Sequence, residues 1–381
     1  MMLIKRAIVY ILVLLLGATG CCRENEVVEV EGRTVLVYMV ASDLTSYLNG
    51  NINDMIRAAT AKNLNGGKLV VFFSKDQSSA ELFEIREGSG GVVTRFHIRD
   101  YENMSGVSSA TLSGVIQEVT GMYPNKSYGL ILSSHGTSWL PSDITLRSFG
   151  EEKGKKMEIY DLAAALPDHL FDFVIFDACS MASAECVYEL RNKADYIVAS
   201  PSETMRYGFP HHLTLPYLFT KEADLENLIR GFYDFYQDEF GDGYRKYPYG
   251  NISITKTDEL EALAAITREI MTSAGDRAIF LPPYPDWQVM TDLRSASTRL
   301  YDFGDVISRI ATEEQYARFT ACMEKAVTGK YTTAETYSSN TGVIPVTHFS
   351  GLSVYPRQAP LTALNEWYRQ LEWYKAVYKN D

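Results

Sequence analysis

A short apolar run that delivers a cysteine into a turn is the feature that most constrains this fold. Residues 171–183 read FDFVIFDACSMAS, which is typical of a buried strand that ends in an acidic residue, with Cys179 in the turn before a helix. Residues 128–141 read YGLILSSHGTSWLP, a second apolar run that ends at His135 and Gly136. If the two strands are parallel neighbours, their carboxyl ends lie at one edge of the sheet. The stretches therefore predict a cysteine–histidine nucleophile pair.

The rest of the chain alternates between strand and helix patterns, which predicts an α/β fold. This alternation favours a mostly parallel sheet with helices on both faces, and residues 80–98 read as an antiparallel hairpin at its edge. Beyond residue 215 the patterns indicate a mixed α/β extension. We expect strands at 34–40, 68–74, 80–86, 92–98, 128–133, 171–177, 195–200, 251–255 and 351–355. We expect helices near 47–62, 108–122, 159–166, 181–193, 225–240, 258–273, 305–328 and 361–378.

Two segments beside the predicted strands carry expectations of their own. Asp43 follows the first strand, and we expect it to cap the next helix rather than to belong to a functional site. Residues 140–156 contain Pro141, two glycines and several basic side chains, which predicts a polar loop between the histidine strand and the helix at 159–166.

The N-terminus has the pattern of a processing signal. Lys5 and Arg6 precede an apolar run at 7–16, and small residues lead to Gly20 and Cys21. This resembles a bacterial lipobox, in which the chain is cut before a cysteine whose thiol is diacylated. We therefore expect secretion across the inner membrane and a lipid anchor at Cys21 in the bacterial cell envelope. The alternative is an ordinary secretion signal followed by a chance cysteine.

These patterns divide the chain into four parts. We expect a lipoprotein signal peptide at 1–20, a tether at 21–33, a catalytic core at 34–215, and a C-terminal α/β region at 216–381 that packs on the core.

Composition excludes several function classes. The formal net charge of −12 argues against nucleic acid as a partner, because no basic stripe offsets it. Five cysteines without CxxC spacing make a disulfide framework or a zinc site unlikely candidates. The chain has neither EF-hand spacing nor an HExxH motif, so we predict no metal site.

The predicted pair carries a specific chemistry. A helix N-terminus and a nearby histidine both favour the thiolate, and Cys179 is expected to use both. His135 would then protonate the leaving amine. Gly136 suits an oxyanion donor because its N–H can approach the substrate closely, and the Cys179 N–H is the expected second donor.

Six motifs carry a resemblance to a known family. LILSSHG at 130–136 and DACSM at 177–181 resemble the two signatures of the clostripain-like cysteine peptidases, which have a caspase-like fold. Further family segments are resembled by TVLVYMVASDL at 34–44, KADYIVASPSETMRYGFP at 193–210, TRLYDFGDVI at 298–307 and GLSVYP at 351–356.

The resemblance implies a cysteine endopeptidase that acts on peptide or protein substrates after Arg or Lys. It implies that Asp177 lines the primary specificity pocket, with Glu203 as a second candidate. Asp177 could also cap the turn by accepting backbone N–H bonds. No organic cofactor is implied, but some relatives depend on calcium, so the resemblance leaves a calcium requirement open.

Two other functions remain open at this point. One is a catalytically silent, surface-binding lipoprotein that has kept the peptidase fold. The other is a cysteine hydrolase of a non-peptide amide, which would use the same pair with a different pocket.

Overall fold

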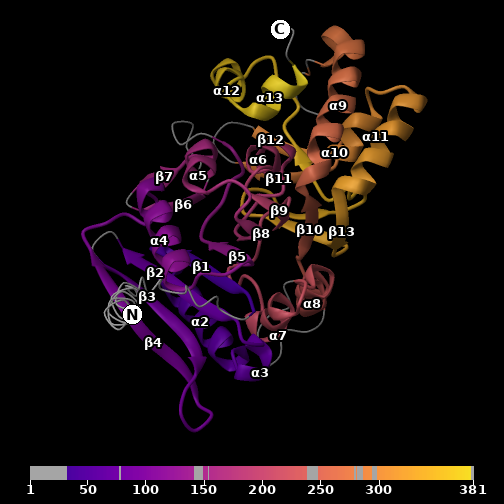
Figure 1. Cartoon of the computed structure of the whole chain (residues 1–381). Helices are drawn as coiled ribbons and strands as arrows, with labels where there is room; N and C mark the ends of the chain where they lie inside the picture. The colour runs from indigo at the N-terminus through magenta and orange to yellow at the C-terminus, as the bar shows by residue number, and fades with distance from the viewer. Residues whose placement is uncertain are drawn as a thin grey trace, which may run out of the picture.

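A nine-stranded sheet forms the centre of the chain (Figure 1). The computed structural model describes residues 32–378, apart from 77–78, 141–148, 153, 238–247, 279, 281–285 and 294–297. Cys21, the predicted signal peptide and all but the last two residues of the predicted tether therefore lie outside the described residues. So do residues 141–148 and 153 of the predicted loop.

The sheet is parallel at its centre and antiparallel at both edges. Its order is β13-β10-β9-β8-β5-β1-β2-β3-β4, and β1, β2, β5, β8 and β9 are parallel to one another. This confirms the predicted α/β fold with a mostly parallel sheet. The strands are β1 (Thr34–Val40), β2 (Lys68–Asp76), β3 (Ser79–Glu87), β4 (Val93–Glu102), β5 (Tyr128–Ser133), β8 (Phe171–Asp177), β9 (Ala194–Ala199), β10 (Asn251–Lys256) and β13 (Val327–Thr332).

Helices cover both faces of the sheet because its central strands are apolar on both sides. In β1, Leu36 and Tyr38 belong to one apolar layer, whereas Val35 and Val37 belong to the other, since residues two apart in a strand share a face. The first layer includes α4 (Ser109–Met122), α5 (Ile159–Ala165), α6 (Ala184–Glu189), α9 (Leu260–Ala274), α10 (Phe303–Ser308), α11 (Glu313–Ala326), α12 (Thr362–Tyr368) and α13 (Glu372–Val377). The second includes α2 (Thr45–Ala58), α3 (Ala61–Leu64) and α8 (Leu225–Gln237), and α7 (His211–Thr214) packs beside α2 and α8.

The C-terminal part of the chain continues the sheet and adds two small ones. β10 and β13 lie beyond residue 215, yet they extend the same sheet as the earlier strands, and the domain boundary predicted there stays a prediction. A three-stranded sheet and a hairpin follow, and Figure 1 shows this orange and yellow part gathered beyond the β9 side of the sheet. They are built from β11 (Val289–Leu293), β12 (Thr298–Asp302), β16 (Ser353–Val354), β14 (Glu335–Ser338) and β15 (Gly342–Pro345).

The segment predicted as a polar loop at 140–156 contains a hairpin, so that prediction is wrong for its described part. β6 (Phe149–Glu152) pairs with β7 (Lys155–Met157). The buried carboxylate of Glu152 accepts hydrogen bonds from the Ser74 hydroxyl at 2.7 Å and the Gly106 N–H at 3.0 Å. These distant partners fix the hairpin, and local sequence patterns do not indicate them.

Four predicted helices are shorter or interrupted. The helix predicted at 47–62 ends with α2 at Ala58, and the separate α3 begins at Ala61. The helix predicted at 181–193 is only α6, because the side chain of Ser183 caps it by accepting a hydrogen bond from the Cys186 N–H. The helix predicted at 305–328 splits at the capping box of Thr312 and ends where β13 begins. The helix predicted at 361–378 divides into α12 and α13.

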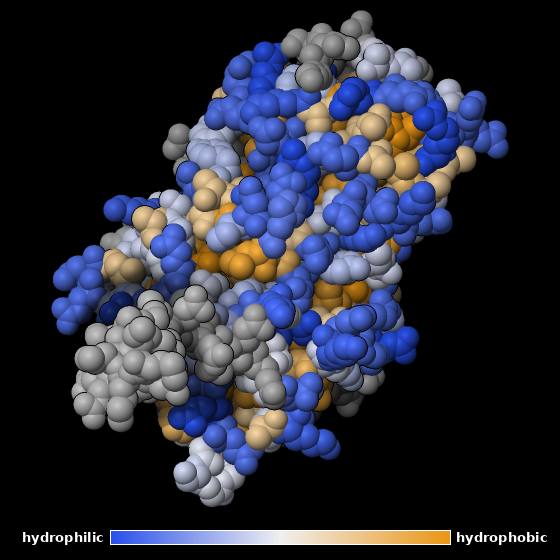
Figure 2. All heavy atoms as spheres, viewed as in Figure 1, coloured by the Kyte–Doolittle hydropathy of each residue, from blue (hydrophilic) through white to orange (hydrophobic). Residues whose placement is uncertain are grey.

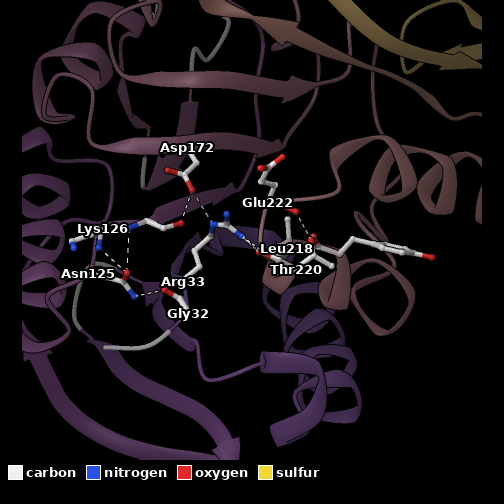
Figure 3. Close-up of polar contacts among 10 residues, drawn as sticks. Gly32, Arg33, Asn125, Lys126, Asp172, Leu218, Thr220 and Glu222 are labelled. Atoms are coloured by element: carbon white, nitrogen blue, oxygen red, sulfur yellow. Dashed lines mark hydrogen bonds and ion pairs between the residues drawn. The ribbon is translucent and has the colours of Figure 1, made fainter. Parts of the chain in front are cut away.

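Arg33 fixes the start of β1 at the amino edge of the sheet (Figure 3). Its guanidinium group is buried and donates to Asp172 at 3.0 Å, to the Leu218 carbonyl and to the Thr220 carbonyl. Asn125 holds the preceding Gly32 carbonyl at 2.7 Å. The chain therefore enters the folded part at the edge opposite to the carboxyl ends of the parallel strands.

The face of the molecule seen in Figure 2 is mostly hydrophilic, with apolar side chains gathered near its middle. Within the described residues, none of the helices combines the length and the apolar character that a membrane span requires.

Candidate active site

Three neighbouring strands each present a chemically active side chain just beyond their carboxyl ends. β1, β5 and β8 are adjacent and parallel, with Met39 beside Ser133 and Ser133 beside Asp177. The next residues along each strand lead to Asp43, His135 and Cys179 in turn. The histidine predicted to face the cysteine thus lies on the middle strand of the three.

A cavity of about 750 Å³ opens at this edge and brings four of the predicted site residues together. His135, Cys179, Asp177 and Glu203 all line it. The remaining walls come from the start of α2, the loop after β9 and the β14–β15 hairpin. They are formed by Leu44, Tyr47, Leu48, Asn51, Ser133, Ser134, Thr204, Met205, Arg206, Tyr207, Gly208, Tyr249, Tyr337 and Ser339.

The Cys179 sulfur contacts Thr204, a residue that sequence reasoning did not single out. The Thr204 N–H donates to the sulfur at 3.3 Å, and the Thr204 hydroxyl lies 3.5 Å from it. Burial raises the pKa of the Cys179 thiol, while the hydrogen bonds from Thr204 lower it and the nearby Glu203 carboxylate raises it. The contact depends on how the loop after β9 folds back, so no local pattern predicts it.

The sequence predicts a helix N-terminus next to Cys179, and this prediction is wrong. α6 begins at Ala184, and the residues between form a turn in which Ser180 has a φ of 60°. The Ser180 N–H bonds the Ser202 carbonyl at 2.8 Å, and this holds the turn against the end of β9. The hydrogen bonds of Thr204 therefore take the place of the predicted helix dipole.

His135 is held by a carboxylate rather than by the thiol. Its Nε2 lies 2.6 Å from Oδ1 of Asp43, and no hydrogen bond joins its ring to the Cys179 sulfur in the described part of the chain. The predicted capping role of Asp43 is wrong, because Leu44 is the N-cap residue of α2 and no side chain caps that helix. Asp43 turns toward the neighbouring strand, and its place after a parallel strand is the signal that could have revealed it.

Gly136 lies where the ends of β5 and β8 come closest. A Cβ atom on this residue would stand 2.6 Å from the Cys179 carbonyl oxygen and 3.0 Å from the Ala178 Cβ, so only glycine fits. Among the described residues, neither the Gly136 N–H nor the Cys179 N–H is used in a hydrogen bond. Both predicted oxyanion donors are therefore unoccupied and close together.

Asp177 forms part of the cavity floor and is almost fully buried. Its carboxylate accepts hydrogen bonds from the Ser133 hydroxyl at 2.8 Å and from the Phe209 N–H at 3.2 Å. Burial raises its pKa to about 6, and these two bonds lower it only in part. The backbone bond is the capping role left open by the sequence, and the cavity position is compatible with the specificity role as well.

Glu203 joins two walls of the cavity. Its carboxylate accepts a hydrogen bond from the Ser339 N–H at 2.9 Å, which links the loop after β9 to the turn of the β14–β15 hairpin. Burial raises the pKa of Glu203 as well. On the other side, the Asn51 amide donates to the Tyr207 carbonyl at 2.8 Å and ties the same loop to α2.

No group of three or more His, Cys, Asp or Glu side chains is arranged to hold a metal ion within the described residues.

Fold and site together define the class of protein. A cysteine and a histidine that line one cavity at the carboxyl edge of a parallel sheet form the arrangement of a cysteine protease. The chain belongs to the clostripain family, peptidase family C11, whose model matches residues 37–380. This confirms the family that the sequence motifs indicated and the enzyme class that they implied.

Similar solved structures agree with this assignment. One is an inactive zymogen of a C11 protease from Parabacteroides distasonis, with 39% identity, coverage of 91% of this chain and 97% of that chain, and a TM-score of 0.80. Another is a secreted C11 cysteine protease from Bacteroides thetaiotaomicron in complex with an irreversible peptide inhibitor. It has 29% identity, covers 92% of this chain and 99% of that chain, and has a TM-score of 0.80. A comparison with curated proteins finds no match.

Proposed function

We propose that this protease hydrolyses peptide bonds after Arg or Lys with Cys179 as nucleophile and His135 as general acid and base. The observation that carries the proposal is one cavity lined by a thiol, an imidazole and a buried carboxylate in a clostripain-family chain. The peptide inhibitor bound by the similar Bacteroides protease supports a peptide as the ligand of this cavity.

The reaction follows from these groups. The Cys179 thiol transfers its proton to His135, and the thiolate attacks the carbonyl carbon of the scissile bond. The tetrahedral intermediate collapses as the imidazolium protonates the leaving amine, which yields a thioester on Cys179. Water then attacks the thioester while His135 accepts its proton. The acid product leaves and the imidazolium returns the proton to the sulfur.

The charge that develops on the carbonyl oxygen needs preorganised donors. The N–H groups of Gly136 and Cys179 are proposed for this role, because Gly136 packs against the Cys179 backbone and neither N–H bonds another described group. Removing one such donor commonly reduces turnover about a hundredfold or more.

Asp177 is proposed to select a basic side chain at the residue before the scissile bond. A carboxylate on the cavity floor can pair with a guanidinium bidentately and with an ammonium through one contact, which favours Arg over Lys. Glu203 adds negative charge at the cavity wall. Its bond with the β14–β15 hairpin makes it the weaker candidate for direct substrate contact.

The protease is further proposed to be anchored in the bacterial cell envelope by lipid on Cys21. The charged start, the apolar run and the Gly20–Cys21 pair support this. The secreted Bacteroides relative supports export of the chain. A chain with two or more acyl groups binds a membrane stably, whereas a single acyl group holds it only weakly.

Single substitutions test the proposed pair. Cys179→Ala and His135→Ala should each abolish hydrolysis of a peptide with Arg before the scissile bond, measured as kcat/KM on the full mature chain. Because the two groups act as a unit, the double variant should be little worse than either single variant. Cys186→Ala is the matched control, since this free cysteine is buried in the first apolar layer away from the cavity.

The alternatives correspond to other outcomes of the same assay. Substantial hydrolysis by either single variant would remove the proposed pair. A wild-type chain that binds peptides without cleaving them would favour the silent, surface-binding function. A chain that cleaves only a non-peptide amide would keep the pair and change the substrate.

A further inference from the structure

We propose that Asp43 is a positioning residue that holds the His135 ring by Nε2 and thereby directs Nδ1 toward Cys179. This inference rests on the proposed function, in which Cys179 and His135 are the reacting pair. It adds a third member, an acid that neither touches the substrate nor transfers a proton to it.

The sheet places the three groups in a row. Asp43 follows β1, His135 follows β5 and Cys179 follows β8, and these three strands are consecutive neighbours. The imidazole therefore stands between the carboxylate on one side and the sulfur on the other. A ring with two nitrogens can face both neighbours only if each nitrogen takes one side.

The contact with Asp43 decides which nitrogen takes which side. Nε2 of His135 lies 2.6 Å from Oδ1 of Asp43, a distance typical of a charge-assisted hydrogen bond. An ionised carboxylate only accepts hydrogen bonds, so Nε2 carries a hydrogen atom. In the neutral ring this leaves the lone pair on Nδ1, which is the nitrogen that can accept the proton of Cys179.

The contact is poorly suited to a purely structural role. The Asp43 side chain is 69% exposed, and an ion pair that exposed contributes little to folding stability because water screens it. The backbone beside Asp43 is nevertheless strained, because Ser42 adopts a φ of 45°, which is unfavourable for a residue other than glycine. A strained turn that delivers an exposed carboxylate to the imidazole is more readily explained by function than by stability.

A second hydrogen bond fixes the relative position of the two strand ends. The Ser134 hydroxyl donates to the Val40 carbonyl at 2.6 Å, so the residue before His135 is tied to the last residue of β1. The Thr45 hydroxyl donates to the Ser42 carbonyl at 3.0 Å and closes the turn that carries Asp43. The carboxylate and the imidazole are thus held by the scaffold before substrate binds.

During the reaction this arrangement has two effects. It fixes the tautomer and orientation of the ring, so Nδ1 is ready to accept the thiol proton and later to protonate the leaving amine. It also places a negative charge beside the imidazolium that exists together with the thiolate. Both effects act on turnover rather than on substrate binding.

Kinetics of Asp43 variants test the assignment. Asp43→Ala should lower kcat about tenfold or more, while KM stays within about twofold and the melting temperature is unchanged. Asp43→Asn keeps the size and a hydrogen-bond acceptor but removes the charge, so its kcat should lie between those of Asp43→Ala and the wild type. Asp100→Asn is the matched control, since Asp100 forms the same kind of exposed pair with Nε2 of His97 at 2.9 Å on β4.

A spectroscopic measurement separates this inference from the proposed function. In ¹⁵N-histidine-labelled Cys179→Ala protein, His135 should be the tautomer with hydrogen on Nε2. Asp43→Ala should shift it toward a mixture, and Asp100→Asn should not. Three results would each overturn the role of Asp43. The first is an unchanged kcat in Asp43→Ala, and the second is a kcat loss that is explained by a matching loss of folded protein. The third is a His135 tautomer with hydrogen on Nδ1. Hydrolysis by Cys179→Ala would instead overturn the proposed function.

Discussion

The Cys179 thiol is subject to two opposing influences. Burial and the nearby carboxylates of Glu203 and Asp177 raise its pKa, whereas hydrogen bonds from Thr204 lower it. In the proposed mechanism the Cys179 thiolate is the nucleophile, so its reactivity depends on how far these bonds, and a histidine brought toward the sulfur, offset burial. Thr204 is therefore the residue whose loss should report this balance most directly.

Thr204→Val tests the balance at nearly constant side-chain volume. Removing the hydroxyl should raise the thiol pKa further, so less thiolate is present at neutral pH. We expect alkylation of Cys179 by iodoacetamide at pH 7 to slow about three- to tenfold, the range that one modest hydrogen bond provides. Thr120→Val is the control, because Thr120 bonds only its own helix α4. An alkylation rate equal to that of the wild type would contradict a role for the hydroxyl.

Most site residues could be predicted from the sequence because they follow buried strands. Cys179, His135, Gly136 and Asp177 all stand at the ends of apolar runs, and His135, Asp177 and Cys179 line one cavity as expected. Asp43 follows the same rule, but a helix cap explained it equally well. Thr204 could not be predicted, because its contact depends on how a loop folds over the sheet edge.

Among the secondary-structure elements, the central parallel strands were predicted best. The parallel strands are buried on both faces, so their continuous apolar runs are readable without any knowledge of their partners. β5 and β8 have the predicted bounds, and β1 does too. Their order in the sheet still required the structure, because the order depends on long-range pairing.

The elements that were missed depend on nonlocal contacts. The β6–β7 hairpin is fixed by the buried Glu152 carboxylate, whose partners lie on β2 and before α4. Its first strand also positions the site, because the Gly150 N–H bonds the His135 carbonyl at 2.9 Å. The predicted helix dipole at Cys179 is also wrong, because α6 begins only at Ala184. The turn before α6 is held by backbone hydrogen bonds to Ser200 and Ser202, which follow β9.

At the scale of the whole molecule, the start of β1 and the candidate active site lie at opposite edges of the sheet. Arg33 fixes the chain at the amino edge, and the cavity opens at the carboxyl edge. β1 between them has seven residues, which corresponds to a separation of roughly 20 Å at about 3.3 Å per residue.

The anchor can be tested at two adjacent cysteines. Mass spectrometry of the natively expressed protein should find a mature chain that begins at acylated Cys21. Cys21→Ser should release the protein from the membrane fraction with its peptidase activity intact, whereas the control Cys22→Ser should remain membrane-bound. A mature chain that begins elsewhere without acyl mass, or release by Cys22→Ser alone, would exclude the proposed anchor.

Irreversible labelling with peptides that differ only in the residue before the reactive group tests the central claim most directly. A peptidyl acyloxymethyl ketone with Arg at that position should modify Cys179, located by mass spectrometry, at least about tenfold faster than its Asp counterpart, because about 1.4 kcal/mol already gives this factor. Asp177→Asn should remove most of the preference. In the wild type the preference should weaken as pH falls through about 6, the pKa to which burial raises Asp177, because protonation removes its charge. Labelling at another residue, or equal rates for the Arg and Asp probes, would contradict the account.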